Sequence, residues 1–192
     1  MKKNTIFVAI GALLLLLLGA FFILPEKSSN LSQFKIATKS YPATLSLVPS
    51  SGDFKVGQTF DVQIKVDTSQ KVIDGVDIYF LNYDPKALGV VDSSDQEGTQ
   101  IKAGSILPIV PYNIVDTQKG QIAFSAIVGG GNQGFSGSGL LATITFKVLA
   151  PSSSSKVYFD STAGVTTDSN IVERGSAQEI LGTVINGDYT LQ

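Results

Sequence analysis

Hydrophobic and polar residues alternate along most of the chain after Ala43. The alternation is clearest in residues 60–67, 122–128 and 140–148. A period of two is typical of β-strands that have one buried and one solvated face. The stretches between such segments are rich in Gly, Pro, Asn, Asp and Ser, which are the residues of turns. No segment after Ala43 has a helical period, so the sequence predicts an all-β domain of nine or ten short strands packed as an antiparallel sandwich.

The N-terminus has a different pattern, because an uncharged apolar run extends from Ile6 to Leu24 behind Lys2 and Lys3. Its length matches the roughly 30 Å hydrocarbon core of a bilayer, and it lacks the polar stripe of a helix in a globular protein. We therefore expect residues 1–24 to be a transmembrane anchor, with a cleaved secretory signal as the alternative. The two lysines favour a cytoplasmic N-terminus. The remainder is then expected outside the cell membrane, or secreted if the segment is cleaved.

The rest of the chain divides into a short linker and one domain. Residues 25–42 contain many Ser, Thr and Lys residues without periodicity, as expected for a tether. Residues 43–192 carry the strand pattern. About 150 residues are enough to bury a sizeable core without disulfides.

Composition excludes several classes of function. The chain has no His and no Cys, which removes His-based catalytic triads, thiol nucleophiles and zinc sites with His or Cys ligands. From Ala43 onward, nine Lys and Arg face 15 Asp and Glu, which gives a formal net charge of −6. An acidic domain is unsuited to binding nucleic acid. These features indicate a domain that works through a surface, and no enzyme activity is expected.

Several short motifs in the domain resemble those of cohesin domains, and they occur in the order of that family. The segment Gly137–Val148 is similar to the "GxGxLATITFKV" strand, and Tyr83–Val91 is similar to the "YDPxxLxVV" corner. Weaker similarities are found at 56–62, 119–126 and 185–191. Each motif is short, but together they extend over about residues 43–192.

The resemblance implies a nine-stranded jelly-roll β-sandwich without catalytic activity. Cohesins use one sheet face to bind a dockerin module, which assembles polysaccharide-degrading enzymes or attaches them to a cell surface. For this chain the resemblance therefore implies a protein partner such as a dockerin-type module, and a surface-displayed role in a polysaccharide-degrading or envelope assembly.

The partner-binding face is expected on residues 76–83. Strict alternation places Asp77, Tyr79, Leu81 and Tyr83 on one side, and the Tyr83 side matches the buried side of the family's strand. The opposite side, expected to bind the partner, holds Val76, Ile78, Phe80 and Asn82. A charged Asp77 fits poorly on a buried side. A central strand buried on both faces would show the same pattern, so that alternative stays open.

Two further hypotheses remain at this point. A carbohydrate-binding module would use exposed aromatic rings, for which Tyr112 and Tyr158 are the candidates because the chain has no Trp. A structural ectodomain of an envelope complex would need no ligand. No cofactor is expected, although Asp160, Asp168 and Asn170 could supply oxygen ligands to calcium. Their spacing matches no calcium loop, and turn residues that cap backbone groups would look the same.

Overall fold

The computed structural model describes residues 39–94, 100–131 and 133–192. The predicted anchor, Ile6–Leu24, and most of the predicted linker lie outside these residues. Within the described part of the chain, no helix is long and apolar enough to span a bilayer.

The described residues form thirteen strands, which confirms the all-β prediction but exceeds the nine or ten strands expected. The difference arises from short strands with weak alternation, such as β2 and β6, and from a segment near the C-terminus that is divided into β12 and β13. The strands are β1 (Ala43–Val48), β2 (Ser51–Phe54), β3 (Thr59–Asp67), β4 (Ile73–Asn82), β5 (Leu88–Val91), β6 (Lys102–Ala103), β7 (Ile109–Asp116), β8 (Gln121–Ile127), β9 (Ser138–Val148), β10 (Ser152–Phe159), β11 (Asn170–Glu173), β12 (Leu181–Ile185) and β13 (Gly187–Leu191).

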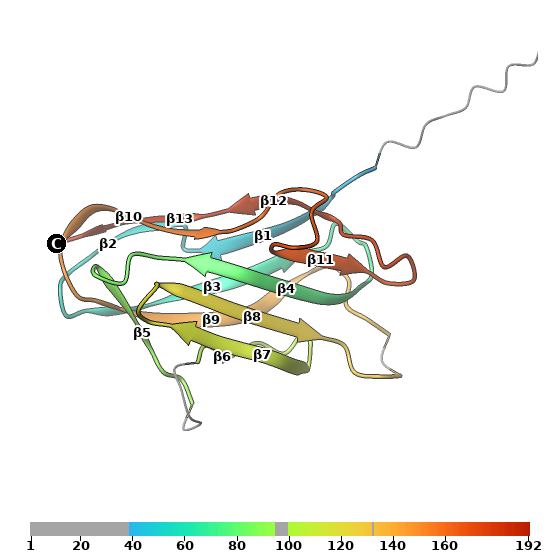
Figure 1. The fold of residues 1–192 in the computed structure, drawn as a ribbon, viewed down its shortest axis with the longest axis horizontal. Helices are drawn as coiled ribbons and strands as arrows, with labels where there is room; N and C mark the ends of the chain where they lie inside the picture. The colour runs from blue at the N-terminus through green and yellow to red at the C-terminus, as the bar shows by residue number, and fades with distance from the viewer. Residues whose placement is uncertain (1–38, 95–99, 132) are drawn as a thin grey trace, which may run out of the picture. The chain divides into compact units, whose positions relative to one another are not determined.

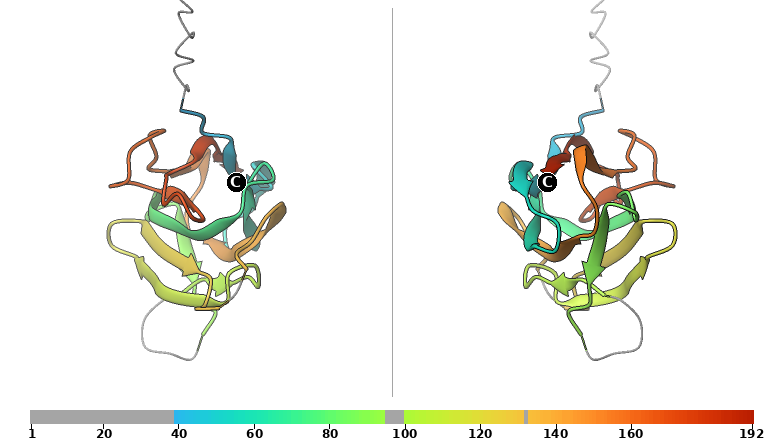
Figure 2. Two further views of the ribbon diagram at one scale, coloured as in Figure 1. Left: turned by 90° about the vertical axis from the view of Figure 1, so that its right-hand side faces the viewer. Right: turned by 90° about the vertical axis from the view of Figure 1, so that its left-hand side faces the viewer.

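The strands form two sheets that pack as a sandwich; they run across the view in Figure 1 and are seen nearly end-on in Figure 2. The six-stranded sheet has the order β12-β1-β3-β9-β5, with β6 paired to β9. The seven-stranded sheet has the order β2-β13-β10-β4-β8-β7, with β11 paired to β4. Most pairs are antiparallel, whereas β1 with β12 and β2 with β13 are parallel. The predicted sandwich is therefore confirmed.

The core lies between the two sheets and is built from the inward positions of the alternating strands. In the six-stranded sheet, Val62, Ile64, Ile144 and Phe146 are buried, as their period of two predicts. In the seven-stranded sheet, the corresponding residues of β8 are Ile122, Phe124 and Ala126. Aromatic rings join the layers: Tyr83 packs edge-on against Phe146, with ring centroids 5.5 Å apart.

A β-bulge interrupts the alternation of β4 and changes which residues face the core. Ile78 pairs with Phe124 and Leu81 pairs with Ile122, so three steps along β4 match two steps along β8. The extra residue shifts the facing by one position. Val76 and Ile78 therefore point inward before the bulge, and Leu81 points inward after it.

The predicted facing of Val76 and Ile78 is consequently wrong. Both side chains are fully buried in the core, at 1% and 0% exposure. The assignment of Asp77 and Tyr79 to the inner side is wrong for the same reason, and this removes the misfit of a charged group in the core. A strict period of two extended over the whole strand produced both errors, since the position of a bulge is not visible in the sequence.

The turn between β7 and β8 holds the seven-stranded sheet against the corner that follows β4. Gly120 has a positive φ of 68°, and a Cβ atom there would lie 2.1 Å from the carbonyl oxygen of Tyr83. The amide of Tyr83 donates to the carbonyl oxygen of Gly120 at 2.8 Å. Only glycine accommodates both this backbone conformation and this close approach.

Candidate functional site

The bulge in β4 places two consecutive aromatic residues on the outer side of the seven-stranded sheet. The rings of Tyr79 and Phe80 pack against each other with centroids 4.5 Å apart and planes tilted by 59°. Tyr79 is 48% exposed and Phe80 is half-buried. Neighbouring residues in a regular strand point to opposite faces, so this contact depends on the extra residue.

Strands β7 and β8 continue the same surface. Tyr112 pairs with Ser125 and Ile114 pairs with Ala123, while Ile127 lies at the end of β8. Tyr112, Ile114 and Ile127 are 49%, 48% and 40% exposed. We call the surface formed by Tyr79, Phe80, Tyr112, Ile114 and Ile127 the apolar face. The ribbons of β4, β8 and β7 lie side by side in Figure 1.

A second bulge shapes this surface on the β7 side. Ile109 pairs with Ile127 and Tyr112 pairs with Ser125, so β7 also gains one residue against β8. Pro111 lies in this bulge, where its missing N–H group breaks no regular ladder. Between Pro111 and Tyr112 on one side and Tyr79 and Phe80 on the other, the surface is hollowed into a cavity of about 470 Å³.

Asp77 borders this cavity and supplies its charge. It lies opposite Ser125 of β8 and is half-buried. Burial raises the pKa of Asp77 above 3.8, because a partly desolvated carboxylate is less stable in its charged form. No ion pair found within the described residues involves Asp77. The cavity thus combines aromatic walls with an unneutralised carboxyl group.

The outer face of the other sheet has the opposite character. Its two central strands, β3 and β9, present outward residues that are all polar or charged: Asp61, Gln63, Lys65, Thr143, Thr145 and Lys147. The Thr145 hydroxyl donates to Asp61 Oδ1 at 2.6 Å. One outer face is therefore an ordinary solvated surface, whereas the apolar face exposes large side chains that water solvates poorly.

The structure retains part of the predicted partner-binding set and adds residues that the sequence analysis missed. Phe80 and Asn82 point outward and are half-buried, and Asn82 Oδ1 accepts a hydrogen bond from Gln121 Nε2 at 3.2 Å. Val76 and Ile78 do not belong to the surface. Tyr79, Ile114 and Ile127 were missed. The alternation of β8 pointed to Ile127, but nothing in the sequence revealed the bulge that exposes Tyr79.

The two predicted carbohydrate-binding tyrosines are exposed but lie apart. Tyr112 belongs to β7 and Tyr158 to β10, with β8 and β4 between them in the sheet. Tyr112 borders the cavity of the apolar face, while Tyr158 borders another cavity near β13. They do not form one platform.

The three calcium candidates lie between the end of β10 and the start of β11, and they differ in exposure. Asp168 and Asn170 are buried and Asp160 is exposed. Asn170 Nδ2 donates to the carbonyl oxygen of Asp168 at 3.0 Å, and the Ser169 amide donates to the carbonyl oxygen of Asp160 at 2.9 Å. Among the residues that the structure describes, no three His, Cys, Asp or Glu side chains are grouped to hold a metal ion.

Comparison with known proteins identifies the fold. The family model of the cohesin domain matches residues 44–184. No curated protein matches the chain. The structure is similar to a type II cohesin domain from the cellulosome of Acetivibrio cellulolyticus, with a TM-score of 0.62 and 19% identity over 77% of this chain and 94% of that one. At this identity, the similarity shows a shared fold.

Two other solved structures give the same result. One is a type I cohesin–dockerin complex from Clostridium thermocellum, with a TM-score of 0.60 and 20% identity over 81% of this chain and 96% of that one. The other is a non-cellulosomal cohesin from the hyperthermophilic archaeon Archaeoglobus fulgidus, with a TM-score of 0.55 and 17% identity over 78% of this chain and 91% of that one.

Proposed function

The chain belongs to the cohesin domain family, and we propose that it is a non-catalytic binding domain that docks a dockerin-type protein module on the apolar face. The observation that carries the proposal is the exposure of Tyr79 on β4 and of Tyr112 and Ile114 on β7, the two strands that flank β8 in one sheet. Large apolar side chains exposed together are typical of protein interaction sites, because covering them removes apolar surface from water.

Three features support a protein partner at this place. The aromatic residues surround a hollow, and buried aromatic anchors in hollows contribute most of the affinity in many interfaces. The apolar face is a rigid sheet, so little conformational entropy is lost when a partner binds. Several similar solved structures are complexes of a cohesin with a dockerin.

The docking proposal is tested by measuring affinity for the dockerin modules encoded in the same genome. The full chain is titrated with each purified module in a calorimeter. For the module that binds, Tyr79→Ala and Ile114→Asp are expected to lower the affinity by about tenfold or more. The matched controls are Gln63→Ala and Lys65→Ala, which lie on the opposite face and should leave affinity unchanged.

The proposal fails if no dockerin module binds, or if a module binds equally well to the apolar-face variants. Loss of affinity in the Gln63 and Lys65 variants alone would place docking on the other sheet. Urea unfolding of each variant separates a loss of binding from a loss of folding.

The proposal extends to the place of the domain in the cell. The run Ile6–Leu24 would anchor the chain in the cell membrane and display the binding domain outside, within a polysaccharide-degrading or envelope assembly. Protease treatment of intact cells, followed by detection of an epitope at each end, tests this arrangement. Removal of the C-terminal epitope alone supports it, whereas release into the medium of a chain that has lost its N-terminal epitope supports signal cleavage instead.

A further inference from the structure

A second cavity lies where the chain crosses twice between the two sheets. Pro49 and Ser50 connect β1 to β2, and Asn186 connects β12 to β13. The crossings are tied together, because the Asp188 amide donates to the carbonyl oxygen of Ser50 at 2.9 Å and the Tyr189 hydroxyl donates to that of Pro49 at 2.7 Å. Next to them is a cavity of about 540 Å³. This volume is within the range of small-molecule sites.

The cavity has apolar walls made by two exposed side chains. Tyr158 of β10 and Ile185 of β12 are each 47% exposed and both line it. Gly187 lies opposite Val157 on the neighbouring strand and contributes backbone alone to the lining. The exposed ring of Tyr158 offers a flat apolar surface on which a ligand ring can stack.

Polar groups surround these walls, and two of them are held in place. Asn186 Oδ1 accepts the Phe159 amide at 3.0 Å, which leaves its Nδ2 group as a donor. Asp188 accepts the Ser154 hydroxyl at 2.8 Å and 3.0 Å through its two carboxylate oxygens, and these oxygens can accept further hydrogen bonds. Ser50 adds a hydroxyl group to the lining.

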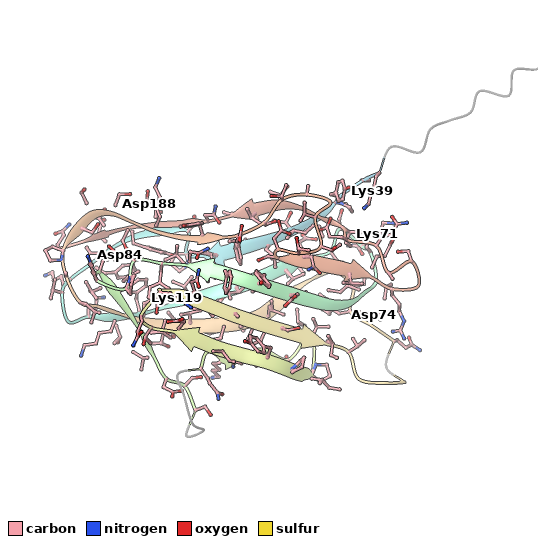
Figure 3. The ribbon with its side chains drawn as sticks, in the orientation of Figure 1. Lys39, Lys71, Asp74, Asp84, Lys119 and Asp188 are labelled. Atoms are coloured by element: carbon pink, nitrogen blue, oxygen red, sulfur yellow. The ribbon has the colours of Figure 1, made fainter. Side chains whose placement is uncertain are left out.

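The charges at the cavity cancel. Lys156 is the cross-strand neighbour of Asp188, and both line the cavity. The three ion pairs found within the described residues do not include Lys156. Its ammonium group is therefore available as a donor beside a carboxylate acceptor. Figure 3 shows Asp188 in the half of the sandwich that also holds Asp84 and Lys119, whereas Lys71 and Asp74 lie at the other end.

From this combination we propose that the cavity is a binding subsite for a neutral hexopyranose unit of a polysaccharide. A pyranose ring has an apolar face of C–H groups, which suits the Tyr158 ring, and a rim of hydroxyl groups that both donate and accept. Lys156 and Asn186 would donate to these hydroxyls, and Asp188 would accept from them. A cavity with no net charge favours a neutral sugar over an acidic one. The subsite is separate from the apolar face, where Tyr79 and Tyr112 lie.

The experiment measures binding of defined oligosaccharides to the full chain, kept in solution by a detergent without a sugar headgroup. Cellohexaose, mannohexaose and hexagalacturonate are titrated separately by calorimetry. At least one of the two neutral sugars is expected to bind, and more tightly than hexagalacturonate. Tyr158→Ala should weaken that binding by about tenfold, because the stacking surface is lost. Tyr158→Phe should retain it, since the ring is kept. Tyr79→Ala, a tyrosine of similar exposure on the apolar face, is the matched control.

Three results would overturn the proposal. The first is that neither neutral sugar binds to the chain. The second is that a neutral sugar binds but the Tyr158→Ala variant binds it as tightly as the unchanged chain does. The third is tighter binding of hexagalacturonate than of either neutral sugar, which would contradict the neutral class. If no sugar binds and Tyr158→Ala weakens a dockerin module instead, the cavity belongs to the protein-docking surface.

Discussion

Ile78 of β4 and Phe124 of β8 are direct cross-strand partners, and both side chains are fully buried between the sheets. One residue further along β4, Tyr79 is 48% exposed on the opposite side. The bulge that follows Ile78 then brings Phe80 to the same outer side as Tyr79. The pairing of Ile78 with Phe124 is therefore the last regular pair before the bulge that places two consecutive aromatic residues on the apolar face.

Replacement of Ile78 by alanine is expected to destabilise the domain. The substitution removes buried methyl groups and leaves a cavity, so the free energy of unfolding should fall by about 2–5 kcal/mol. Tyr79→Ala, one residue away on the outer side, should change it by about 1 kcal/mol or less. Urea unfolding followed by circular dichroism checks both values. Equal losses in the two variants would contradict the observed facing of β4.

Asp77 is expected to reduce stability at neutral pH. Its pKa is raised by burial, so the folded state binds this proton more tightly than the unfolded state, whose pKa is near 3.8. Its contribution to stability is thus present below about pH 3.8 and is lost as the pH rises through the folded pKa. Asp77→Asn should therefore raise the free energy of unfolding at neutral pH.

The control for Asp77 is Asp61→Asn, on the polar face of the other sheet. Asp61 is exposed and accepts a hydrogen bond from Thr145, which an asparagine can still accept. The two variants are compared by urea unfolding at neutral pH and at acid pH. A gain of the same size at both pH values in Asp77→Asn would show that the carboxylate charge is not the cause.

Glu179 is expected to stabilise the domain by joining a loop to β12. Its side chain is buried and accepts two backbone amides, from Gly164 at 2.8 Å and from Leu181. Glu179→Ala leaves both amides without this acceptor, which should cost about 1–3 kcal/mol for each amide that stays buried and unpaired. Hydrogen exchange should accelerate at these two amides specifically.

The control for Glu179 is Glu173→Ala. Glu173 forms an ion pair with Lys71 at 2.8 Å near the surface, where water and salt weaken such pairs. Its loss should lower stability distinctly less than the loss of Glu179. A larger effect from Glu173→Ala would contradict the role assigned to Glu179.

Alkaline conditions are expected to destabilise the fold through two buried tyrosines. Burial raises the pKa of Tyr83 to about 12, with a smaller contribution from the negative charge of Asp116, and burial raises the pKa of Tyr189 to about 12. The unfolded chain loses these protons near pH 10, while the folded protein keeps them. Stability is therefore fully present below about pH 10 and falls between about pH 10 and pH 12.

Ultraviolet titration of the phenol groups and denaturant unfolding across that range check this prediction. Tyr83→Phe should reduce the alkaline loss without breaking a hydrogen bond, because the Tyr83 hydroxyl is buried and has no partner among the residues that the structure describes. Tyr189→Phe also removes the bond to Pro49 and should lower stability at neutral pH as well. An unchanged alkaline loss in both variants would assign the effect to other groups.

The sequence by itself determined the fold class and most of the core. Strands β3, β8 and β9 keep a strict period of two. The side chains of these strands that face the core could be predicted from the alternation, because successive Cβ atoms in a strand point to opposite faces. The motifs at Tyr83–Val91 and Gly137–Val148 also indicated the cohesin family, which the match over residues 44–184 shows.

The tertiary structure decided where the surfaces lie. The bulge after Ile78 depends on the register of β4 against β8, which is a non-local property, and two adjacent aromatic residues fit the sequence pattern with or without it. The cavity at Tyr158 depends on two chain crossings, around Pro49 and Asn186, that are far apart in sequence. Alternation determines which side of a strand is apolar. The strand pairing decides whether that side faces the core or the solvent.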